Sequence, residues 1–269
     1  MLIHKGRGGT TAPAGGLAAA VGPGRSGPGR PEAAKIARMA VFSGITFAIL
    51  FTAALVLVNQ IPRLDSPDST YTAFYASGSG RVLVTVGLYL VPFAGIVFLS
   101  FMMAFRALLD RPADLIQGLQ LASGVVFICM LFAGSAAVGA VALMLHFAEV
   151  PAPPVSVDRV LSSVGYGLVF AYGVRVAGVF TITTTTLARR AGLMPRWLAI
   201  LSYLMAAFLL ATTTTQPATL LVYPAWVVLL SLAVVRSARI RAVPAAAVPP
   251  GPSRAGAPGG AAAERLDTR

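Results

Sequence analysis

The chain has 269 residues, of which 57% are hydrophobic and only 11% are charged. Soluble domains carry about 25% charged residues, so this composition excludes a soluble globular protein. The formal net charge is +12, but the basic residues flank apolar runs or lie in two tails rich in Gly, Pro and Ala. Anionic lipid is therefore a better counter-charge than nucleic acid, and we expect no nucleic-acid partner.

The two ends of the chain differ in composition from its middle. Residues 1–38 contain many Gly and Pro residues and scattered bases. Such a segment cannot bury enough apolar surface to fold, so we predict a disordered basic tail. Residues 237–269 have the same character and are predicted to form a second disordered tail. Residues 39–236 between them are predicted to form the transmembrane domain.

The middle region contains six apolar segments able to cross a hydrocarbon core of about 30 Å. They comprise residues 39–60, 82–109, 117–147, 160–187, 197–211 and 219–235. Inside a bilayer the backbone must satisfy its own hydrogen bonds, so these spans are predicted to be helices. The expected fold class is all-α, a polytopic membrane protein with a bundle of about six transmembrane helices and disordered cytoplasmic tails.

The connection between the first two spans, residues 61–80, carries the signal of a short helix. The Ser-Pro-Asp sequence at 66–68 is typical of a helix start. Tyr71, Phe74 and Tyr75 follow at the spacing of one helical face. Two interpretations stay open, a helix lying on the outer leaflet and a lid or partner surface. These three aromatic residues are the candidate outer-loop surface.

Small residues recur along the third and fourth predicted spans, at 133–140 and 165–178. Spacings of this kind allow two helix backbones to approach closely within a membrane. We expect these faces to pack the two helices together within one bundle. The alternative is that they form the interface of a homodimer.

Arg175 lies near the middle of the fourth span, where a charged side chain by default marks a functional site. Tyr172 and Thr183 are placed on the same helical face and complete a candidate intramembrane polar site. No acidic residue is expected at this depth. One interpretation is a structural arginine whose long stem reaches toward the inner interface. The other is a site for an anionic solute or a lipid headgroup.

The lysines and arginines are distributed unequally between the two sides of the predicted membrane domain. With six spans both termini share one side, and 17 of the 21 basic residues lie on it, against three on the opposite side. Loops rich in lysine and arginine remain cytoplasmic during insertion. Both termini are therefore predicted to be cytoplasmic.

Groups that could carry catalysis or bind a metal are scarce. The sequence has two histidines, His4 and His146, and one cysteine, Cys129. No His, Cys, Asp or Glu cluster has the spacing of a metal site, and no phosphate-binding loop is present. We therefore expect a non-enzymatic protein without a metal or another cofactor.

Four stretches of the chain are similar to segments of a known family. They are residues 74–81 (FYASGSGR), 91–102 (VPFAGIVFLSFM), 195–203 (PRWLAILSY) and 223–232 (YPAWVVLLSL). On these stretches the chain resembles a family of actinobacterial multi-pass membrane proteins of uncharacterised function, over residues 70 to 236. An aromatic residue commonly stands in that family where this chain has Ser100. The resemblance implies an integral plasma-membrane protein and no particular reaction.

Together these patterns predict a multi-pass protein of a bacterial plasma membrane. Its expected role is structural, or an interaction in the cell envelope, through contacts with the lipid bilayer and with a second copy or another membrane protein. The alternative function is a transporter or channel component that handles an anionic solute or a lipid headgroup near Arg175.

Overall fold

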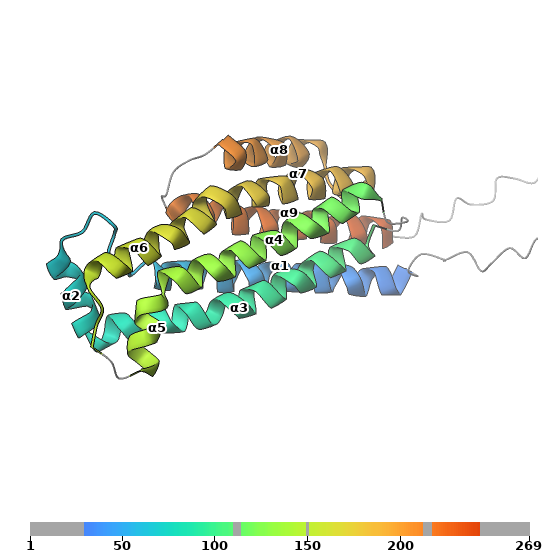
Figure 1. Ribbon diagram of the computed structural model, residues 1–269. Coiled ribbons are helices and arrows are strands. Elements are labelled where there is room, and N and C mark those ends of the chain that lie inside the picture. Colours follow the sequence, from blue (N-terminus) through green and yellow to red (C-terminus); the bar gives the residue numbers. More distant parts are fainter. Residues whose placement is uncertain (1–29, 110–113, 149–150, 212–216, 243–269) are drawn as a thin grey trace, which may run out of the picture.

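The computed structural model describes residues 30–109, 114–148, 151–211 and 217–242. Within these ranges the regular elements are helices and no strand occurs (Figure 1), which confirms the prediction of an all-α polytopic membrane protein. Among the described residues, five helical segments are long and apolar enough to cross a membrane. The fifth predicted span forms a shorter apolar helix.

The first long helix, α1 (Arg30–Val58), begins nine residues before the predicted span. Pro31 lies in its first turn, where a missing N–H costs nothing, and strong helix formers follow it. The structure therefore makes residues 30–38 helical, and it also makes residues 237–242 helical, although the sequence suggested disordered tails over residues 1–38 and 237–269. The rest of the two predicted tails, residues 1–29 and 243–269, lies outside the described residues.

The next two long helices are α3 (Gly78–Ala107) and α4 (Leu115–Val138). α3 packs along α1 and also contacts α4. The third span was predicted to continue to residue 147, and this boundary is wrong. Helix α4 ends at Gly139, and a separate short helix, α5 (Ala140–Phe147), turns away from its axis (Figure 1).

The helix breaks at Gly139, and α3 passes close to the chain at this residue. Its backbone has φ −93° and ψ 4°, outside the helical region. A Cβ added at Gly139 would lie 2.1 Å from Cδ1 of Leu88 on α3. The absence of a side chain therefore lets α3 approach the chain where α5 leaves the line of α4.

The fourth predicted span is part of a continuous helical rod of 36 residues. It consists of α6 (Val155–Tyr166), a π-helical segment η1 (Gly167–Gly173) and α7 (Val174–Arg190). α7 packs along α4. The rod is longer than about 20 residues, the length that crosses a bilayer, so one end of it is available to build structure outside the hydrocarbon core.

Two further helices complete the bundle. Helix α8 (Arg196–Ala211) packs on α7 and, with 16 residues, is about 24 Å long. A 3-10 turn, η2 (Pro217–Leu221), leads into α9 (Val222–Ala242), which lies along α1. The buried indole Nε1 of Trp226 on α9 donates to Oγ of Ser202 on α8 at 2.9 Å.

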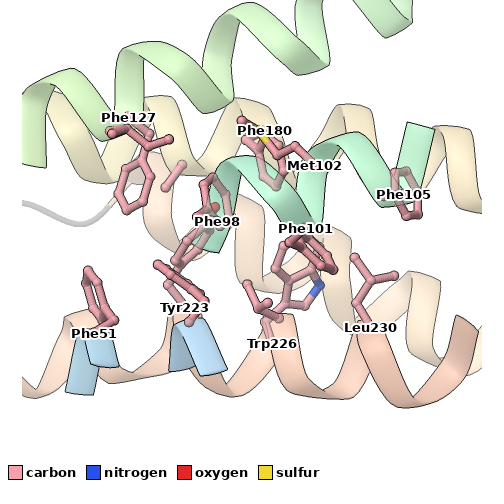
Figure 2. Packing of buried hydrophobic residues seen from close by; sticks show 14 of the residues in the cluster. Phe51, Phe98, Phe101, Met102, Phe105, Phe127, Phe180, Tyr223, Trp226 and Leu230 are labelled. Atoms are coloured by element: carbon pink, nitrogen blue, oxygen red, sulfur yellow. The ribbon is translucent and has the colours of Figure 1, made fainter. Parts of the chain in front are cut away.

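Aromatic rings fill the centre of the bundle (Figure 2). Phe98 of α3 is fully buried, and its ring centroid lies 4.7 Å from that of Phe47, 5.2 Å from that of Phe180 and 6.0 Å from that of Tyr223. These partners come from α1, α7 and α9. One side chain thus ties together four helices that are distant in sequence.

The bundle has two different ends (Figure 1). We call the end where α1 begins and α7 ends the basic end. Its side chains include Lys35, Arg38, Arg106, Arg189, Arg190, Arg196 and Arg236. We call the opposite end the cap end, formed by α2 (Asp68–Ala76), α5 and the start of α6. The basic residues there are Arg63, Arg81 and Arg159.

Candidate functional site

Arg175, the first candidate from the sequence, is bound to its own helix. It is half-buried near the start of α7, and its Nη1 donates to the carbonyl oxygen of Ala171 and, at 3.5 Å, to that of Phe170. Both carbonyls belong to the π-helical segment η1. The guanidinium therefore satisfies backbone acceptors at the point where the hydrogen-bond pattern changes from π to α.

The structure does not bring Arg175, Tyr172 and Thr183 together into one polar stripe. The Tyr172 side chain is 63% exposed, whereas Thr183 is 5% exposed and donates to the carbonyl of Val179 at 2.9 Å. The Tyr172 side chain is thus turned outward and that of Thr183 toward the interior of the bundle, so the two do not form one inward-directed stripe.

The second candidate, the set of three aromatic residues on α2, does not form a free surface. Tyr71 is fully buried, and its hydroxyl donates to the carbonyl oxygens of Pro62 at 3.2 Å and Arg63 at 3.0 Å. Phe74 and Tyr75 are half-buried and pack against a small apolar cluster, formed by Ile61, Val84, Leu88, Val138 and Ala142. The short helix was correctly predicted, but its aromatic face points into the protein.

Arg159 of α6 holds α2 and the loop before it in place. Its Nη2 lies 2.7 Å from Oδ1 of Asp68 and donates to the carbonyl oxygen of Ser66 at 2.6 Å. The guanidinium carbon lies 5.3 Å from the ring centroid of Tyr71, in the position of a cation–π contact. One side chain thus contacts the loop, the start of α2 and its buried tyrosine.

Asp158, the neighbour of Arg159, makes a second bond between α6 and α2. The hydroxyl of Tyr75 donates to Oδ1 of Asp158 at 3.1 Å. Asp158 is only 2% exposed, and its other oxygen, Oδ2, has no hydrogen-bond partner within the described residues. Burial, together with the nearby Asp158, raises the pKa of Tyr75 well above its ordinary value. The Tyr75 hydroxyl therefore remains a donor throughout the physiological pH range.

A cavity of about 330 Å³ lies beside this pair of residues. Tyr75 and Asp158 line it from α2 and α6, and Arg81 lines it from the first turn of α3. Nε of Arg81 is buried without a partner, and no described carboxylate lies within ion-pair distance of its guanidinium. The cavity thus has an acidic and a basic residue in its walls that do not pair with each other.

Sequence reasoning did not identify Asp158, Arg159 or Arg81 as site residues. They entered the prediction only as charges near the outer membrane face. Asp158 bonds to Tyr75 of α2, 83 positions away along the chain, and Arg159 bonds to Ser66 of the preceding loop, 93 positions away, so no local spacing could have linked them. The signal in the sequence was that charged and aromatic residues occur in both loops predicted to lie at the outer membrane face.

The described residues do not include three or more His, Cys, Asp and Glu side chains arranged to hold a metal ion. Comparisons with protein-family models, with curated proteins and with solved structures gave no match to this chain. The functional proposal below therefore rests on the geometry of the cap end and of Arg175.

Proposed function

We propose that the protein is a non-enzymatic, multi-pass protein of a bacterial plasma membrane, of the actinobacterial type that its motifs resemble. We propose further that it acts through contacts between its cap end and a partner in the cell envelope. The observation that carries this proposal is the position of Arg159, which fixes α2 and the preceding loop by two short polar contacts. A loop held in one conformation offers a partner a preorganised surface.

The outward side of α2 is suited to such contacts. Its exposed residues are small and mostly polar: Asp68, Ser69, Thr70, Thr72, Ala73 and Ala76. Its aromatic residues, in contrast, are turned inward and anchor the helix. A partner would therefore meet hydroxyl groups and backbone on a rigid support.

The distribution of charge supports the orientation that we propose for this surface. Seven of the basic side chains described above lie at the basic end and three at the cap end. Lysine and arginine are retained on the cytoplasmic side during insertion, so the basic end is assigned to the cytoplasm and the cap end to the outside. A reporter fused after residue 269 tests this assignment, because it should be active only in the cytoplasm.

The contacts of Arg175 favour a structural role over the alternative of anion transport. Its guanidinium binds carbonyl groups of its own helix. Chloride flux into liposomes that contain the Arg175→Ala variant tests the alternative. Unchanged flux with normal insertion removes it, and a loss of flux would restore it.

The proposed partner contact is tested with a photoreactive amino acid at Ala73 in native membranes. We expect it to form an adduct with a discrete protein, and we expect Arg159→Ala to weaken that adduct because α2 is then released. The same amino acid at Phe42, a 74% exposed position on α1 among lipid-facing residues, serves as the control. Adducts with lipid alone at Ala73 would contradict the proposal.

A further inference from the structure

The walls of the cap-end cavity include one acidic and one basic side chain that form no ion pair with any described residue. Asp158 is 2% exposed, yet Oδ2 accepts no hydrogen bond from the described residues. A buried carboxylate is normally paired with a cation or with several donors, because leaving it unpaired is costly. Tyr75 supplies only one donor, and Arg159 is bound to Asp68 and to the loop. Within the described residues, Asp158 therefore has no cationic partner.

Arg81, on another wall of the same cavity, is a cation without an anionic partner among the described residues. It stands in the first turn of α3 and is half-buried, and its Nε has no acceptor. No described carboxylate lies within 4.0 Å of its guanidinium, so Asp158 and Arg81 do not neutralise each other. A guanidinium in this position is suited to a carboxylate or a phosphate group.

The remaining walls and the size of the cavity limit what can fill it. Val141 and Leu145 of α5 and Val155 of α6 supply aliphatic surface. A volume of about 330 Å³ is at the lower end of the range for small-molecule pockets. The space accommodates a small molecule with an apolar part, and it is too small for a folded segment of another protein.

We propose that this cavity binds a small zwitterion, with its ammonium group at Asp158 and its anionic group at Arg81. Two sources share this chemistry, a free amino acid with an aliphatic side chain and the phosphoethanolamine headgroup of a lipid. This proposal goes beyond the partner contact on the outward side of α2 and does not depend on it. Binding supplies the cation that Asp158 lacks and the acceptor that Arg81 lacks.

The test uses the full chain in nanodiscs of phosphatidylcholine, whose methylated ammonium has no N–H to donate. Calorimetric titration and thermal shift are measured with leucine as the free zwitterion. Two matched probes each lack one charge: 3-methylbutylamine lacks the carboxylate and 4-methylpentanoate lacks the ammonium. We expect leucine to bind at least about tenfold more tightly than either, because each loses one charged contact.

A second set of nanodiscs contains phosphatidylethanolamine and no amino acid. If the lipid headgroup is the ligand, these nanodiscs raise the melting temperature of the wild type and leucine does not. If the free amino acid is the ligand, the reverse holds. The proposal is overturned if neither leucine nor phosphatidylethanolamine has an effect, or if leucine binds and either single-charge probe binds as tightly as leucine.

Variants connect any binding to the two charged residues. Asp158→Asn and Arg81→Gln should each reduce the affinity at least about tenfold. Asp65→Asn and Arg63→Gln are matched controls, because this pair lies at the same end with side chains 77% exposed. Equal affinity in Asp158→Asn, Arg81→Gln and the wild type would overturn the proposal.

One further variant guards against loss of binding through misfolding. Ala152 is exposed and lines the cavity, so Ala152→Phe should block entry without disturbing the buried contacts. We expect its melting temperature without ligand to equal that of the wild type, and its ligand-induced shift to be lost. A full shift in this variant would place the ligand elsewhere and overturn the proposal.

Discussion

Gly134 on α4 and Gly165 on α6 lie so close that a Cβ added to Gly165 would be 2.5 Å from the carbonyl oxygen of Gly134. The same added atom would be 3.0 Å from the backbone N of Val138. Backbone atoms cannot move aside as the end of a flexible side chain can. This contact confirms the prediction that the small residues of the third and fourth spans pack two helices together within one bundle.

The contact predicts that Gly165→Ala destabilises the protein although alanine favours helices. We expect a loss of about 1–3 kcal/mol in the free energy of unfolding, the range found for overpacked cores. Gly167→Ala is the matched control, since nothing lies within 4 Å of a Cβ at that position. Denaturation in detergent micelles measures both. Equal stability of the two variants would contradict the close approach.

Arg159 provides the second prediction, on the cap end. Arg159→Ala removes the bonds to Asp68 and Ser66 and the contact with the Tyr71 ring, so hydrogen exchange should accelerate across residues 62–76. Asp68 is largely exposed, so its ion pair contributes little, and the bond to the buried side of the loop contributes most. We expect a local loss of about 1–2 kcal/mol.

Arg159→Lys should rescue only part of this protection, because one ammonium group cannot replace the planar fork of the guanidinium. Arg63→Ala should leave the exchange rates unchanged, since the Arg63 side chain is 77% exposed and only faces Asp65. Full protection of α2 from hydrogen exchange in Arg159→Ala would contradict this prediction. It would show that the packing of Tyr71 alone is sufficient to hold the cap end.

The sequence predicted the location of most spans because long apolar runs report directly on burial in lipid. It did not predict that the chain turns after Gly139. Both α4 and α5 are apolar, and hydropathy does not indicate a change in the direction of the helix axis. The prediction for Tyr71 had a related weakness. Helical spacing places it on one face with Tyr75, but spacing alone does not say whether that face meets lipid, water or protein.

The candidate site at Arg175 shows a different limit of sequence reasoning. Helical spacing placed Tyr172 and Thr183 on one face. It did not show that the first side chain would be exposed and the second buried. At the cap end the difficulty was distance along the chain, because the partners of Asp158 and Arg159 lie 83 and 93 positions away in the sequence.

Gln120 on α4 gives the third prediction. It is fully buried, and neither Oε1 nor Nε2 has a partner in the described residues. Removing an unpaired polar group and keeping its shape is neutral or stabilising. We therefore expect Gln120→Met to keep or raise the melting temperature. Gln60→Met, at an exposed position two residues after the end of α1, is the control for the change in composition. A clear loss of stability in Gln120→Met would mean that the carboxamide binds a water molecule or an ion.

The fourth prediction concerns the pH dependence of the cap and begins with Tyr75. Burial and Asp158 raise the pKa of Tyr75 in the folded protein above its ordinary value near 10. The folded state therefore keeps a proton that the unfolded chain releases above pH 10. The stabilising contribution of this tyrosine is fully present below pH 10 and is lost as the pH rises beyond it, toward the raised folded-state pKa.

Tyr75→Phe should change this behaviour in two ways. At neutral pH it leaves Oδ1 of the buried Asp158 without its donor, which should cost about 1–3 kcal/mol. Above pH 10 its free energy of unfolding should fall less steeply than that of the wild type, by about 1.4 kcal/mol per pH unit for the one proton removed. Denaturation at a series of pH values measures both effects. Parallel curves above pH 10 would show that Tyr75 is ionised in the folded protein, and the bond to Asp158 would then have to be abandoned.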